Sequence, residues 1–127
     1  MAVLEAATMF AEISGGAFDV TIAPVINLWR NCTKQFTLPC SSEIEKALSF
    51  SGCHNLRLDK ERNTAFLLNM GCLVDLGAIG KGFAADSCIE IYRSMGIRAA
   101  FINLGGNVKT LGNFIFTINC CKITIAV

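Results

Sequence analysis

The segment from Val74 to Asp86 constrains the fold most, because it joins two kinds of secondary structure through a glycine-rich turn. The short apolar run Leu73–Leu76 predicts a strand. A helix is predicted from about Gly80 to Met95, since apolar residues recur there at helical spacing: Ala84, Cys88, Ile91 and Met95. Gly96 suits the position just after the helix end. The apolar segment Ala99–Asn103 predicts a buried strand, which completes one β-α-β passage.

The rest of the chain combines helical and extended patterns. Ala2–Ile13 predicts a helix, and a second is predicted from near Ser42 to Gly52, where Ser42 and Glu45 fit a capping box. Residues 17–29 are interpreted as irregular because Pro24 lies in their middle. Further strands are predicted at Asn55–Leu58, Thr64–Leu68, Val108–Leu111, Phe114–Ile118 and Ile123–Val127. The pattern favours an α+β fold.

Composition narrows the class of protein. A chain of 127 residues is one domain or part of one, and 53% hydrophobic against 17% charged residues excludes disorder. Eleven basic and ten acidic residues leave no charge pattern for binding nucleic acid or an anionic membrane. The longest uncharged stretches have 12 residues, too few for a transmembrane helix of about 20. A chain this short and apolar is expected to direct part of its apolar surface at sequence outside it.

The cysteine pattern and the N-terminus bear on cellular location. The seven cysteines cannot all pair within the chain, and they form neither a C-x-x-C motif nor, with one histidine, a zinc-binding spacing. Buried free thiols in a reducing compartment are therefore favoured. The first ten residues carry Glu5 rather than a basic stretch before an apolar core, so no signal peptide is expected. As it stands, the chain reads as cytoplasmic.

The glycine-rich turn and the helix that follows it could bind an anion. The turn offers free backbone N–H groups, the helix N-terminus carries a partial positive charge, and Lys81 adds a full one. The alternative is a tight strand-to-helix connection with a solvated lysine. A Walker A loop is excluded because Asp75 and Gly82 replace the required glycine and Ser/Thr. A Rossmann site is disfavoured because no acidic residue follows Glu90.

Two other segments could contact a ligand. In Ser14–Thr21, a glycine pair allows close backbone approach, Phe18 offers a ring for stacking and Asp19 offers an acceptor. The alternative is a helix stop followed by a core phenylalanine. In Asn103–Asn107, Gly105 and Gly106 permit either a ligand near the backbone or simply a sharp turn.

Taken together, three segments resemble the ApbE family of FAD:protein FMN transferases: SGGAFDVTIAPVINLW, VDLGAIGKGFAAD and FINLGGNV, in this order. Val20 stands where the family usually has proline, and Ala78 and Gly80 exchange the usual glycine and alanine. The resemblance covers residues 1–112 as the central part of the domain and leaves 113–127 as a divergent tail. It implies an α+β, T-fold-like domain with a mixed sheet and packed helices, of which this chain holds an incomplete part.

The resemblance also implies a reaction and its residues. Members transfer FMN from FAD to a Thr or Ser hydroxyl of an acceptor protein, with Mg²⁺, and release AMP; many are periplasmic or membrane-anchored. The matching positions imply FAD contacts at Ala17, Phe18, Asp19, Asp75 and Lys81, and a Mg²⁺-ligating backbone carbonyl at Ala78. No catalytic residue is assigned. The alternative is a non-catalytic fragment that binds flavin nucleotides weakly or not at all.

Overall fold

The computed structural model describes residues 1–118 and 121–125 of the chain. These form two compact units, Met1–Ala78 and Ile79–Val127, which are described separately below. Within the described residues, no helix is both long and apolar enough to cross a membrane.

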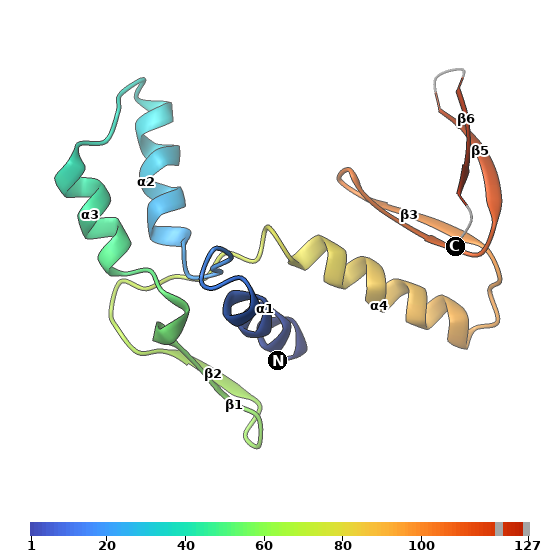
Figure 1. The fold of residues 1–127 in the computed structure, drawn as a ribbon, viewed down its shortest axis with the longest axis horizontal. Helices are drawn as coiled ribbons and strands as arrows, with labels where there is room; N and C mark the ends of the chain where they lie inside the picture. Colours follow the sequence, from blue (N-terminus) through green and yellow to red (C-terminus); the bar gives the residue numbers. More distant parts are fainter. Residues whose placement is uncertain (119–120, 126–127) are drawn as a thin grey trace. The chain divides into compact units, whose positions relative to one another are not determined.

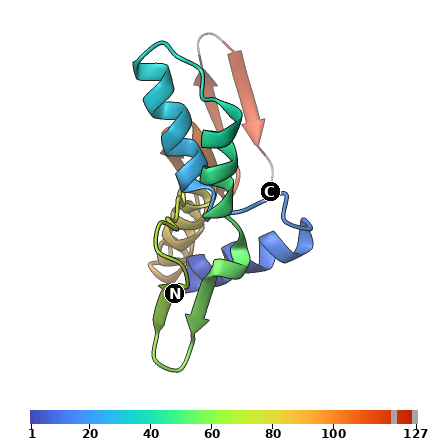
Figure 2. The same ribbon diagram turned by 90° about the vertical axis from the view of Figure 1, so that its left-hand side faces the viewer.

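The first unit holds the chain's first three α-helices and a hairpin. Its elements are α1 (Ala2–Ile13), α2 (Ala23–Lys34), α3 (Ser41–Ser49), the short 3-10 helix η1 (Cys53–Asn55), β1 (Leu56–Asp59) and β2 (Thr64–Leu67). Helices α2 and α3 lie side by side, and β1 and β2 form an antiparallel hairpin in register from Leu56 with Leu67 to Asp59 with Thr64 (Figures 1 and 2). The predicted first helix, the second helix and both strands are confirmed within a few residues.

Helix α2 occupies much of the segment that was expected to be irregular, so that expectation is wrong. Pro24 lies in the first turn of the helix, where its missing N–H has no helical partner in any case and its fixed φ suits the helix. The backbone N–H groups of Val25 and Ile26 donate to the carbonyl of Ile22 and close this first turn. A proline that suggests a break can therefore mark a helix start.

Helix α3 begins one residue before the predicted capping residue, and its cap differs from the expected one. Cys40 is the N-cap, and its backbone N–H donates to Glu43 Oε2 over 2.8 Å. The carboxylate of Glu43, not that of Glu45, therefore satisfies a free N–H group at the helix start. This contact lowers the pKa of Glu43 below its ordinary value of 4.5, and the Cys40 thiol contributes in the same direction.

The cap should weaken in acid. Because the pKa of Glu43 is lowered in the folded chain, its contribution to α3 is complete above about pH 4.5 and is lost as the pH falls through the lower folded value. We expect NMR signals from the first turn of α3 to follow this titration in the wild type and not in Glu43→Gln. Glu45→Gln, on the same helix, is the control. An unchanged titration in Glu43→Gln would contradict the cap.

The expected strand Leu73–Leu76 is reduced to a single contact. Leu73 forms an isolated parallel bridge with Ile22, and the N–H of Asp75 donates to the carbonyl of Val20 over 2.8 Å. The two segments are thus joined at one point rather than along a strand. This point nevertheless brings together parts of the chain that are about 50 residues apart in sequence.

The described residues of the second unit form one helix and two antiparallel strand pairs. Its elements are α4 (Gly80–Ser94), β3 (Ala100–Leu104), β4 (Asn107–Leu111), β5 (Phe114–Ile118) and β6 (Cys121–Ile125). Strands β3 and β4 pair antiparallel, as do β5 and β6. The expected strands are confirmed, apart from residues 126–127 of the last one, which lie outside the described residues. Among the described residues, the strands form three two-stranded antiparallel sheets.

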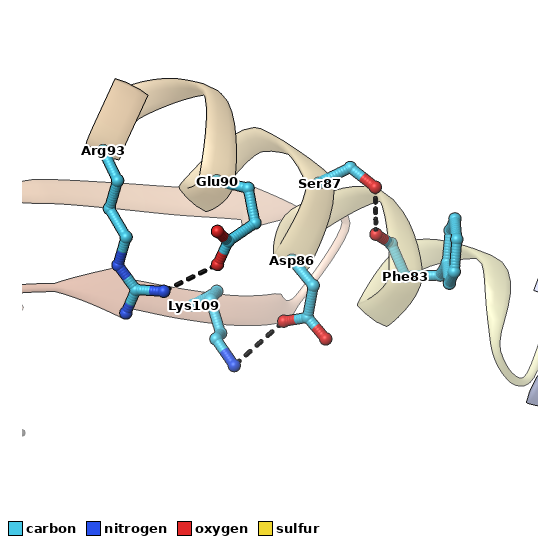
Figure 3. A network of polar contacts seen from close by, with 6 residues as sticks. All are labelled: Phe83, Asp86, Ser87, Glu90, Arg93 and Lys109. Carbon is cyan, nitrogen blue, oxygen red and sulfur yellow. Dashed lines mark hydrogen bonds and ion pairs between the residues drawn. The ribbon is translucent and has the colours of Figure 1, made fainter. Parts of the chain in front are cut away.

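The core of the second unit lies where α4 meets β3. Ala85, Ile89 and Ile102 are buried, and Cys88, Tyr92, Leu104 and Leu111 pack around them. The predicted helix is confirmed, but its inward face is shifted by about one residue, since Ile91 and Met95 are exposed. Polar residues of α4 form two ion pairs, one of them with β4 (Figure 3). Lys109 Nζ lies 2.9 Å from Asp86 and Arg93 lies 2.6 Å from Glu90.

Some cysteines and several large apolar side chains are exposed. Five cysteines are free thiols: Cys32, Cys40, Cys53, Cys72 and Cys88. Cys72 is buried and Cys40 is exposed, so the expectation of buried thiols holds only in part. Several large apolar side chains are almost fully exposed, among them Phe36 at 98% and Met70 at 95%. Among the described residues, large apolar side chains thus remain exposed.

Candidate functional site

The first of the three motifs begins in the loop after α1, where two glycines leave the backbone without side chains. Gly15 and Gly16 have φ values of +61° and +86°, a region that glycine enters without steric cost. Ser14 Oγ accepts the N–H of Phe18 over 2.9 Å, which closes the loop on itself. The ring of Phe18 is half-buried and packs edge-on against Phe10, with centroids 6.2 Å apart. Phe18 is thus partly a core residue, as the alternative interpretation of this segment held.

Asp19 is half-buried and its carboxylate is held by its neighbour Thr21. Asp19 Oδ1 accepts both the backbone N–H and the hydroxyl of Thr21, each over 2.7 Å. A pocket of about 360 Å³ opens beside it. Its lining residues come from the motif loop and from the end of α3 with the loop that follows: Gly16, Ala17, Asp19, Ile22, Leu48, Ser51 and Gly52. An acceptor therefore faces a cavity whose walls are otherwise small or apolar.

Asp75 anchors the second motif against the first. Besides the bond from its N–H to the Val20 carbonyl, its Oδ1 accepts the N–H of Gly77 over 2.7 Å. Its Oδ2 lies 3.6 Å from the guanidinium of Arg30 on α2. Arg30 was not singled out from the sequence, and no local pattern could have found it, because the pair spans 45 positions. Asp19 and Asp75 thus belong to one connected region of the first unit.

The second unit brings Lys81 to the third motif. Lys81 lies in the first turn of α4, and its ammonium nitrogen would be 3.6 Å from a Cβ placed on Gly105. Gly105 and Gly106 have φ values of +60° and +92°, and the N–H of Gly106 donates to Asn103 Oδ1 over 2.8 Å. A positive charge, a helix N-terminus and a turn without side chains therefore lie close together. Such an arrangement is suited to binding a phosphate group.

The predicted site residues fall into two groups. Ala17, Phe18, Asp19, Asp75 and Ala78 belong to the first unit, and Lys81 belongs to the second. Ala78 is exposed at the end of its unit. No group of three histidine, cysteine, aspartate or glutamate residues that could hold a metal occurs among residues 1–118 and 121–125. Since Mg²⁺ takes six oxygen ligands, one carbonyl does not make a magnesium site.

The fold and these motifs define the chain as a member of the ApbE family, whose model matches residues 1–126. Among curated relatives, an FAD:protein FMN transferase of Klebsiella pneumoniae is 33% identical over 87% of this chain and 35% of its own length. Another of the same name from Treponema pallidum is 33% identical over 87% of this chain and 32% of its own length.

Solved structures agree on the fold. The ApbE protein of Thermotoga maritima is 28% identical and superposes with a TM-score of 0.77 over 98% of this chain and 45% of that chain. The flavin transferase ApbE from Vibrio cholerae, at 22% identity, has a TM-score of 0.76. The predicted α+β, ApbE-like fold is confirmed. The chain spans about a third of the length of the curated relatives and under half of the solved chains.

Proposed function

We propose that this chain contributes the flavin-nucleotide-binding part of an FAD:protein FMN transferase. The observation that carries the proposal is that Lys81, in the first turn of α4, lies beside the side-chain-free turn Gly105–Gly106. This arrangement suits the diphosphate of FAD. The names of the curated relatives support the same substrate. Asp19 would accept a hydrogen bond from a hydroxyl or ring N–H of the nucleotide in the pocket beside it.

The proposed reaction is a phosphoryl transfer. A Thr or Ser hydroxyl oxygen of an acceptor protein bonds to the phosphorus on the FMN side of FAD. The bond from that phosphorus to the bridging oxygen breaks, AMP leaves with the bridging oxygen, and the hydroxyl proton is released. In such reactions the protein acts mainly by positioning the nucleotide and stabilising its charge. Lys81 would neutralise phosphate charge, while Ala17, Phe18, Asp19 and Asp75 would position the nucleotide.

The family resemblance implies Mg²⁺ as the metal of the reaction. The carbonyl of Ala78 would supply one ligand, and the described residues do not supply the others. The second candidate function is that of a non-catalytic chain, which binds flavin nucleotides weakly or not at all and transfers no FMN. The test is to incubate the full chain with FAD, Mg²⁺ and an acceptor flavoprotein, and to look for covalent flavin fluorescence on the acceptor in a denaturing gel. Labelled acceptor supports transfer, whereas unlabelled acceptor supports the second candidate.

Removing the positive charge at Lys81 should weaken FAD binding. We expect Lys81→Met to raise the Kd for FAD about tenfold, since a charge-assisted contact to phosphate contributes about 1.5–3 kcal/mol and water replaces part of it. Titration of flavin fluorescence measures the Kd. Lys109→Met is the matched control, because it removes the same charge from an ammonium that Asp86 already neutralises at 2.9 Å. Equal effects of the two substitutions would show that Lys81 makes no specific contact.

A further inference from the structure

Two polar side chains are buried in the first unit next to the pocket that holds Asp19. Thr21 is 0% exposed and Asn55 is 2% exposed. A buried polar group costs free energy unless it is hydrogen-bonded, so its partners reveal what holds it in place. Every buried polar side-chain atom among the described residues has such a partner.

The hydroxyl of Thr21 joins two segments that are far apart in sequence. Thr21 Oγ1 donates to Asp19 Oδ1 over 2.7 Å and accepts the backbone N–H of Gly52 over 2.7 Å. The single hydroxyl proton is thus directed at Asp19, because the N–H of Gly52 occupies the acceptor side of the oxygen. The orientation of the Asp19 carboxylate therefore depends on a contact that spans 31 positions of the chain.

The Gly52 end of this connection is itself fixed. Gly52 has a φ of +125°, and a Cβ at this position would overlap the imidazole of His54. The carbonyl of Gly52 accepts the N–H of Asn55 over 2.9 Å. Asn55 Oδ1 in turn accepts a hydrogen bond from Asn69 Nδ2 over 2.7 Å. The N–H that reaches Thr21 thus comes from a loop that is anchored on its other side.

Only one oxygen of the Asp19 carboxylate accepts hydrogen bonds from Thr21. Oδ1 receives the N–H and the hydroxyl of Thr21, while Oδ2 receives no hydrogen bond from the described residues. Asp19 and Gly52 both line the pocket of about 360 Å³. Saturating Oδ1 leaves Oδ2 as the acceptor for a hydroxyl or ring N–H of a ligand in that pocket.

We infer that Thr21 is a positioning residue for nucleotide binding: its buried hydroxyl, held by the N–H of Gly52, orients the Asp19 carboxylate toward the ligand. This inference rests on the proposed function, in which Asp19 contacts FAD. Thr21 does not itself touch the nucleotide. Its effect on binding therefore passes through Asp19 and disappears when Asp19 can no longer act as a carboxylate.

The test is a double-mutant cycle on the full chain, with the Kd for FAD as readout. Thr21→Val keeps the shape of the side chain but removes the hydroxyl, and should raise the Kd on the order of tenfold. Thr21→Ser keeps the hydroxyl and should restore the Kd to within about twofold of the wild type. Thr21→Val should have no further effect in an Asp19→Asn background, because interacting residues are not additive. Thr33→Val, an exposed threonine on α2, is the control for the chemical change.

The outcomes separate the inference from the proposed function. If the wild type binds FAD and Thr21→Val binds it equally well, the inference is overturned and the proposed function stands. Effects of Thr21→Val and Asp19→Asn that simply add would assign Thr21 a merely structural role and also overturn it. A wild type that binds FAD no better than Asp19→Asn and Lys81→Met overturns both. Should Thr21→Val fail to fold, Thr21→Ala provides the same comparison with a smaller side chain.

Discussion

Replacing Gly112 by alanine should destabilise the β3–β4 hairpin by about 2–5 kcal/mol. Gly112 follows β4 directly and has a φ of +66°, where a residue with a Cβ is strained. A Cβ at this position would also overlap the carbonyl oxygen of Arg98 and lie 3.4 Å from Ala99 Cα. Neither backbone atom can move freely, because Ala100 and Leu111 are paired one step further along the hairpin. Hydrogen exchange of the β3 and β4 amides measures the loss.

Gly96 provides the matched control for Gly112. Its φ of +76° is equally unfavourable for alanine, but no atom lies within 4 Å of the Cβ that alanine would add. Gly96→Ala should therefore cost only the conformational term of about 1–2 kcal/mol. The difference between the two variants isolates the overlap with Arg98. If Gly112→Ala cost no more than Gly96→Ala, the close approach of these two backbone segments would be contradicted.

The end of α4 shows why some local predictions from the sequence hold. Gly96 was expected just after the helix. In the structure its N–H donates to Arg93 and that of Ile97 donates to Tyr92, as in a Schellman motif. Such an ending depends on a few neighbouring residues and on glycine's access to positive φ. The same kind of local reasoning gave a wrong prediction at Pro24. Proline interrupts a helix in its interior but is favoured in the first turn, where Pro24 lies in α2.

The inward face of α4 could not be fixed from the sequence. Apolar residues occur on more than one side of this helix, so both Ala84–Cys88–Ile91 and Ala85–Cys88–Ile89 form acceptable stripes. Contact with Ile102 on β3 decides in favour of the second, and the pairing of that strand is not encoded within the helix itself. The choice between two neighbouring stripes is thus a property of the tertiary structure.

The candidate site likewise combines residues that short motifs indicate with partners that only the structure shows. Asp19, Asp75 and Lys81 could be singled out as candidates from short motifs, because glycines and charged residues stand there at a recognisable spacing. The partners that hold them could not: Arg30 lies 45 positions from Asp75, and Gly52 acts on Thr21 through its backbone N–H, which any residue type except proline offers. Sequence motifs thus indicate candidate groups for contact with a ligand, and the structure shows what orients those groups.

Truncating Ile89 to alanine should destabilise the second unit by about 2–5 kcal/mol, the usual range for a large aliphatic side chain in a core. Ile89 is 2% exposed at the centre of the cluster with Ala85 and Ile102, so the substitution leaves a cavity between α4 and β3. Because a unit this small has few other core contacts, this loss is a large part of its stability. Urea denaturation followed by circular dichroism measures it.

Ile91 on the same helix tests whether the effect comes from burial. It is 56% exposed, so Ile91→Ala removes the same atoms mainly from a surface in water and replaces isoleucine by a better helix former. We expect this variant to lie within about 0.5 kcal/mol of the wild type. A larger loss at Ile91 than at Ile89 would restore the face predicted from the sequence and contradict the packing of α4 on β3. The packing of α4 on β3 matters for the candidate site as well, because α4 carries Lys81 beside Gly105.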